Sequence, residues 1–220
     1  MNQNQKKTST KPTQHLQFTE LSKIPWKIFH INACFNGYPF ETGQQSNIIL
    51  HIGNIVTDME STVFYLTGLG GKLDTGLGQA LRDLGVTYSG ISYSGSFEYL
   101  SHSKKLLLVK EKLSEFVEMG GNKLVAVSAG GLLIVELLEE VHFPNLEILL
   151  LSPVLPNHPT ITNQPKSLRI IFGSDDYLYY ESRTNNLLNS ILNSSFLLVD
   201  GAGHDLPHGI VRDELISWIE

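Results

Sequence analysis

From about residue 60 onward, short apolar runs alternate with segments in which apolar residues recur every three or four positions. The short runs are typical of buried strands, and the spaced segments are typical of helices packed along one face. We predict strands over 61–67, 86–93, 124–127, 146–151, 168–172 and 196–199. We predict helices from 74 or 75 to 84 and over 103–119, 132–141, 178–192 and 210–219. This alternation predicts an α/β protein with a mainly parallel twisted sheet and helices on both faces.

The chain before residue 60 has a different pattern. Residues 26–34 and 47–56 each alternate apolar with polar positions, and a segment containing Gly, Pro and Asn separates them. They are expected to be two leading strands, antiparallel neighbours at a sheet edge, which brings the sheet to about eight strands. Residues 1–20 are mostly polar and are expected to be a flexible tail, so that 21–220 form a single domain.

Composition narrows the class of protein. The 220 residues are 41% hydrophobic and 17% charged, and the net charge of −6 has no long run of one sign. This disfavours a nucleic-acid or anionic-membrane partner. The single cysteine, Cys34, forbids an internal disulfide and fits a reducing compartment. The sequence has no run of 18 apolar residues and no signal-peptide pattern, so a cytoplasmic protein without a membrane span is expected.

The segment with the clearest chemistry surrounds Ser128. It follows the strand predicted over 124–127 and precedes a helix, and the positions two before and two after it are Ala126 and Gly130. Strand, Ser and helix joined through small residues is the layout of a nucleophile elbow, in which a tight turn lifts the hydroxyl clear of the sheet. The simpler interpretation is that Ser128 only caps the following helix.

A serine nucleophile needs a base and an acid to orient that base. The base candidate is His204, which follows the last predicted strand after small residues, with His208 as the fallback. The acid candidates are Asp175 and Asp176, which follow Gly173 at a strand end. No metal-ligand spacing is present, and neither a dinucleotide fingerprint nor a P-loop completes the glycine-rich segment 68–71.

These segments, taken together, resemble the landmarks of the α/β-hydrolase superfamily. The landmarks are the glycine-rich loop 68–71, the elbow at Ser128, the acid after Gly173 and the terminal His204, in the family's order of Ser, acid and His. The resemblance covers roughly residues 45–220. The family's acid usually lies three residues after a glycine, which selects Asp176. The family's oxyanion loop implies that the backbone N–H groups of Leu69 and Ala129 hold the substrate oxygen.

Two positions depart from the family pattern: Thr67 stands for the usual His before the loop glycine, and Ala126 for the first elbow glycine. The segment between the strands predicted at 146–151 and 168–172 is too short for a large lid, so an open site is expected.

The resemblance implies a serine hydrolase that cleaves an ester or thioester of a small-molecule acyl substrate through an acyl-enzyme on Ser128, without a cofactor. Two further interpretations remain. An acyltransferase would use the same acyl-enzyme with another acceptor. A non-catalytic binding module would have the fold alone.

Overall fold

The computed structural model describes residues 62–159 and 161–220, and six of its strands form one sheet in the order β2-β1-β3-β4-β5-β6. Every pairing between neighbouring strands is parallel. The strands are β1 (Val63–Leu66), β2 (Tyr88–Ile91), β3 (Lys123–Val127), β4 (Glu147–Leu151), β5 (Ser167–Gly173) and β6 (Ser194–Val199). The predicted mainly parallel sheet is confirmed. The expected tail and the two expected leading strands, over 26–34 and 47–56, lie outside the described residues.

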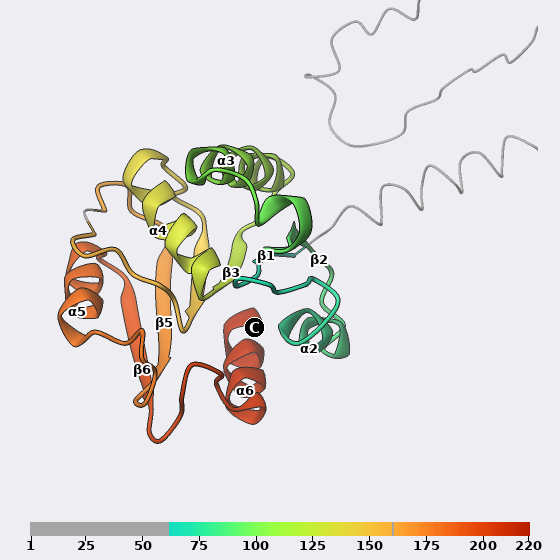
Figure 1. Ribbon diagram of the computed structural model, residues 1–220. Helices are drawn as coiled ribbons and strands as arrows, with labels where there is room; N and C mark the ends of the chain where they lie inside the picture. Colours follow the sequence, from blue (N-terminus) through green and yellow to red (C-terminus); the bar gives the residue numbers. More distant parts are fainter. Residues whose placement is uncertain (1–61, 160) are drawn as a thin grey trace, which may run out of the picture. The chain divides into compact units, whose positions relative to one another are not determined.

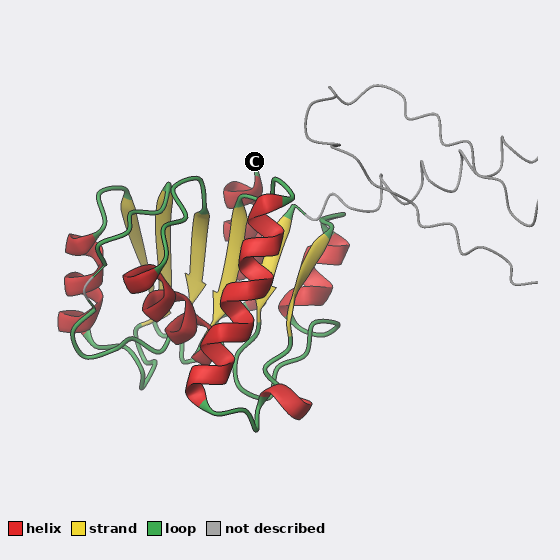
Figure 2. Cartoon of the chain, turned by 90° about the horizontal axis from the view of Figure 1, so that it is seen from above, coloured by secondary structure: helices red, strands yellow, loops and turns green. Residues whose placement is uncertain are grey.

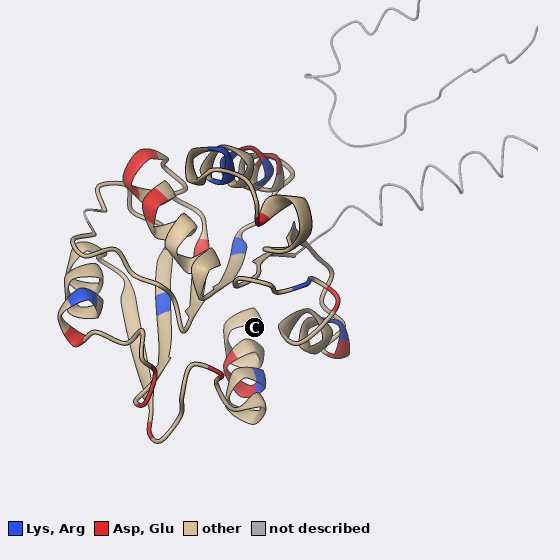
Figure 3. Ribbon diagram, in the orientation of Figure 1, with Lys and Arg blue, Asp and Glu red and all other residues tan. Residues whose placement is uncertain are grey.

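Helices cover both faces of this sheet, as predicted (Figures 1 and 2). On one face lie α3 (His102–Glu118), α4 (Ala129–Glu140) and α5 (Glu181–Ser190), and on the other lie α2 (Leu77–Asp83) and α6 (His208–Ile219). A short 3₁₀ helix, η2 (Gly95–Phe97), precedes α3. Acidic and basic side chains are interspersed on α2, α3, α5 and α6 (Figure 3).

The alternation of side chains along each strand supplies both cores. In β3, Leu124 and Ala126 join the core under α3, α4 and α5, whereas Val125 joins the core under α2 and α6. All three side chains are completely buried. Strands buried on both faces have nearly continuous apolar sequences, so the sequence alone predicts them.

Two helices begin later than their apolar spacing predicts, for local reasons. Helix α2 starts at Leu77 because Gly76, at φ 53°, turns the chain just before it. Helix α5 starts at Glu181 rather than 178 because the carboxylate of Asp176 accepts the backbone N–H of Leu178 at 2.9 Å. This side-chain turn occupies the residues that helical spacing assigned to the first turn of the helix.

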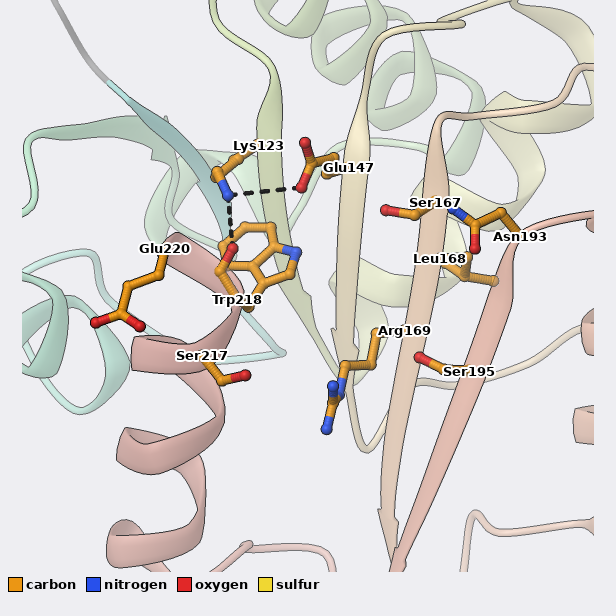
Figure 4. Close-up of a pocket in the computed structure, with 10 residues that line it drawn as sticks. All are labelled: Lys123, Glu147, Ser167, Leu168, Arg169, Asn193, Ser195, Ser217, Trp218 and Glu220. Carbon is orange, nitrogen blue, oxygen red and sulfur yellow. Dashed lines mark hydrogen bonds and ion pairs between the residues drawn. The ribbon is translucent and has the colours of Figure 1, made fainter.

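Polar contacts attach α6 to the amino-terminal half of the sheet, around a pocket of about 310 Å³ (Figure 4). Lys123 Nζ donates to the backbone oxygen of Trp218 at 2.6 Å and lies 3.5 Å from Glu147 Oε2. Arg169 forms an ion pair with Glu214 of α6. Because charged and polar residues make up most of its lining, this pocket is typical of a solvent-filled space.

Burial of one tyrosine makes stability depend on pH. Tyr65 is 5% exposed, and burial raises its pKa from 10.0 to about 12, with a smaller contribution from Tyr88. The unfolded chain therefore ionises first as pH rises, and the folded state loses about 1.4 kcal/mol per pH unit between pH 10 and 12. We expect the free energy of unfolding, measured with urea at pH 9 and pH 11, to fall more between these pH values in the wild type than in Tyr65→Phe. An equal difference between the two proteins at both pH values would contradict the assignment.

Candidate active site

The predicted nucleophile, acid and base lie together at the carboxyl edge of the sheet. Ser128 directly follows β3, Asp176 follows the end of β5, and His204 follows β6. Because the strands are parallel, all three connections leave the sheet at the same edge. The three side chains come from segments far apart in sequence, and the fold brings them within hydrogen-bond distance of one another.

A chain of hydrogen bonds joins these three side chains. The Nε2 atom of His204 lies 3.0 Å from the Ser128 hydroxyl oxygen, and its Nδ1 lies 3.1 and 3.0 Å from the two carboxylate oxygens of Asp176. A carboxylate only accepts, so the Nδ1–H donates to Asp176, and Nε2 is left to accept the serine proton. This is the arrangement that a general base requires.

The backbone at Ser128 has the sharp turn that the elbow motif predicts. Its φ of 49° is in the left-handed region, which only one other described non-glycine residue, Ser152, also adopts. Helix α4 begins at the next residue, so the N–H of Ala129 has no acceptor within that helix. The Ser128 N–H donates to Leu151 of β4 at 3.0 Å, which ties the turn to the sheet.

Small residues around the turn are required by close backbone approaches. A Cβ at Gly130 would lie 2.6 Å from the Thr67 carbonyl oxygen. A Cβ at Gly173 would lie 2.1 Å from the Ala202 carbonyl oxygen, and Asp175 N–H donates to that same oxygen at 2.8 Å. The close approach at Gly173 holds the segment that carries the acid against the segment that carries the histidine.

The choice between the two aspartates follows from how the chain turns after β5. The N–H of Asp176 donates to the Gly173 oxygen at 3.2 Å, and the Asp176 side chain is fully buried against His204. Asp175 is exposed, and its carboxylate accepts a bond from the Ser174 hydroxyl at 3.1 Å. A buried carboxylate beside the imidazole would stabilise a positive charge that develops on the ring. The fallback base, His208, is the first residue of α6.

The glycine-rich loop after β1 lies beside the serine. A Cβ at Gly68 would be 3.0 Å from the Cβ of Ser128, so Leu69, the next residue, is near the nucleophile. Thr67 is buried, and its hydroxyl accepts the Tyr93 N–H at 2.6 Å and lies 3.1 Å from the Gly71 oxygen. In the sequence, Thr67 stands out only as a departure from the family pattern, whereas in the structure its hydroxyl holds the loop in shape.

From the sequence, Tyr177, Tyr179 and Tyr180 are a cluster that fits either a substrate groove or the core and helix surface, and the second interpretation is favoured. In the structure the Tyr177 ring lies 5.3 Å from the imidazole of His204, centroid to centroid. The connection from β4 to β5, residues 152–166, contains no helix in its described part. Within the described ranges, no group of three or more His, Cys, Asp or Glu side chains is placed to hold a metal ion. None of the described helices is both long and apolar enough to span a bilayer.

Comparisons with known proteins identify the fold. No family model matches the sequence, and no curated protein matches it. Solved structures do match. A predicted CIB-like hydrolase from Thermoplasma acidophilum is 14% identical, with a TM-score of 0.54 over 73% of this chain and 86% of that one. A monoacylglycerol lipase from Paleococcus ferrophilus is 12% identical, with a TM-score of 0.54 over 71% and 93%.

A third match is an alpha-beta serine hydrolase homologue from Coxiella burnetii, 15% identical, with a TM-score of 0.54 over 72% of this chain and 85% of that one. The described part of the chain therefore has the α/β-hydrolase fold, which confirms the fold that the resemblance implied. At these identities the likeness concerns the fold alone.

Proposed function

We propose that this protein is a serine hydrolase that cleaves an ester or thioester of a small-molecule acyl substrate. The observation that supports this most strongly is the hydrogen-bonded series of Asp176, His204 and Ser128, with the serine on a strained turn at the start of a helix. A solvated serine on a plain surface would need neither the buried acid nor the left-handed backbone. Their coincidence at one sheet edge favours catalysis over a helix-capping role.

The reaction proceeds in two steps, acylation of Ser128 and hydrolysis of the acyl-enzyme. The Ser128 oxygen bonds to the acyl carbon while its proton passes to Nε2 of His204. The bond from the acyl carbon to the leaving oxygen or sulfur breaks, and the leaving group takes that proton. Water then attacks the acyl-serine, gives its proton to Nε2 and releases a carboxylic acid, and the proton returns to Ser128.

Two backbone donors stabilise the negative oxygen of each tetrahedral intermediate. They are the N–H groups of Leu69 and Ala129, from the loop beside Ser128 and from the first residue of α4. Such donors act where charge develops, and the loss of one typically costs about 10²–10³-fold in rate. The helix N-terminus adds a favourable dipole at the same place. Asp176 holds the histidine in the correct tautomer throughout.

The test is covalent labelling with a fluorophosphonate probe, read by intact mass. The wild type is expected to gain one adduct, and Ser128→Ala to gain none, because the probe reacts with an activated serine. Ser152→Ala is the matched control, since Ser152 also has a positive φ and directly follows a strand, but its buried hydroxyl makes no hydrogen bond to a base. It is expected to label fully. A folded wild type without an adduct would favour the non-catalytic binding module.

A further inference from the structure

Three tyrosines follow the acid, and the structure gives each a different environment. Tyr179 packs between Phe172 and Phe196, with ring centroids 5.4 and 6.0 Å away. Tyr180 lies against the Arg183 guanidinium, 4.2 Å from the ring centroid. Both therefore have a partner within the fold. Tyr177 differs, because the ring that it contacts belongs to the proposed base.

The Tyr177 ring lies 5.3 Å from the His204 ring at an interplanar angle of 45°, yet the residue remains 73% exposed. One part of the ring contacts the imidazole and the rest faces solvent. Leu69, beside Ser128, is 66% exposed. Ser128 follows β3. Leu69 follows β1 and Tyr177 follows β5, which lie on opposite sides of β3 in the sheet order β1-β3-β4-β5. Two exposed apolar side chains thus stand on the loops to either side of Ser128, which is typical of a binding surface.

The chemistry of acyl transfer decides which part of a substrate meets each side chain. The carbonyl oxygen must approach the Leu69 and Ala129 N–H groups, where its charge is stabilised. The leaving oxygen must come within hydrogen-bond distance of His204 Nε2, because it receives the proton from that atom. Whatever is attached to the leaving oxygen therefore lies beside the imidazole, and Tyr177 is the ring packed against that imidazole.

We propose that Tyr177 is a specificity-determining residue that contacts the leaving group, and that the enzyme prefers esters of alcohols that carry an aromatic ring. The proposal rests on the proposed hydrolase function and extends it to one half of the substrate. The exposed part of the Tyr177 ring offers an aromatic leaving group both apolar area and ring-to-ring contact. A small aliphatic alcohol would reach little of it.

The experiment compares two acetate esters that differ only in the alcohol. Benzyl acetate and ethyl acetate share the acyl group, and both release unconjugated primary alcohols, so their chemical steps are closely matched. We expect the wild type to have a higher kcat/KM for benzyl acetate. In Tyr177→Ala the ratio of the two kcat/KM values is expected to fall about five- to tenfold. Because the effect is a ratio, any loss common to both substrates, such as a displaced histidine, cancels.

Two variants and one further substrate make the result specific. Tyr177→Phe keeps the ring and is expected to keep the wild-type ratio. Tyr180→Ala removes a nearby exposed tyrosine that contacts Arg183 instead of His204, and it is expected to leave the ratio unchanged. Ethyl phenylacetate places the aromatic ring on the acyl side, and its ratio to ethyl acetate is expected to be insensitive to Tyr177→Ala.

The outcomes that overturn the proposal are distinct from failure of the proposed function. If Ser128 is labelled and both esters are hydrolysed, but the benzyl-to-ethyl ratio is unchanged in Tyr177→Ala, the leaving-group contact is wrong. It is also wrong if only the ethyl phenylacetate ratio falls, because the ring then serves the acyl side. A folded protein that neither labels nor hydrolyses any ester overturns the hydrolase assignment itself, and the role of Tyr177 with it.

Discussion

Asp176→Asn is expected to lower kcat by about 10³–10⁴-fold while the protein stays folded. The amide fits the same space, but its NH₂ can donate to Nδ1 of His204, which moves the imidazole proton to Nε2. That nitrogen then has no lone pair for the Ser128 proton, so His204 can no longer act as the proposed base even though all three side chains remain in place. The measurement is kcat on a simple acetate ester, with circular dichroism and urea unfolding to establish the fold.

The neighbouring aspartate supplies a matched control for that result. Asp175→Asn makes the same chemical change one residue earlier, on an exposed side chain that bonds Ser174 rather than His204. It is expected to keep kcat within about twofold, as for surface changes away from reacting groups. If Asp175→Asn lost activity and Asp176→Asn retained it, the acid would be assigned to the wrong residue.

The parallel sheet explains why so much of the site could be predicted. Once strands were expected to end before Ser128, the aspartates and His204, parallel pairing placed all of these residues at one edge without further information. The glycines at 130 and 173 indicate the same places, because each marks a close backbone approach that a larger side chain would block.

The sequence alone does not show which side chains are buried in the site, because that depends on the path of the backbone in the turns. Asp175 and Asp176 are the same type of residue in two different environments. Only the turn in which the Asp176 N–H donates to the Gly173 oxygen decides which carboxylate is buried. Thr67 and Tyr177 were difficult to interpret for the same reason. Their importance lies in contacts with Tyr93 and His204, which are distant in sequence and have no local pattern.

The elbow glycine connects stability to activity. A Cβ at position 130 would lie 2.6 Å from the Thr67 carbonyl oxygen and 2.9 Å from the Leu66 carbonyl oxygen. These are backbone atoms at the end of β1, which is paired with β2 on one side and β3 on the other, so they have little freedom to move. The start of α4 must shift instead, and it carries the Ala129 N–H and follows Ser128 directly.

Gly130→Ala is therefore expected to lower the free energy of unfolding by about 1–3 kcal/mol, the usual cost of overpacking. It is also expected to lower kcat about 10²-fold in the fraction that remains folded, because Ser128 and Ala129, the proposed nucleophile and oxyanion donor, are displaced from the loop beside them. Urea unfolding and active-site labelling measure the two effects separately.

Gly209→Ala in α6 is the control, since a Cβ there meets nothing within 4 Å. Alanine favours helices over glycine by about 0.5–1 kcal/mol, so this change should leave stability unchanged or raise it. Equal stability of the Gly130 variant and the wild type would mean that the helix can retreat without cost, and the close approach would not be what fixes the serine.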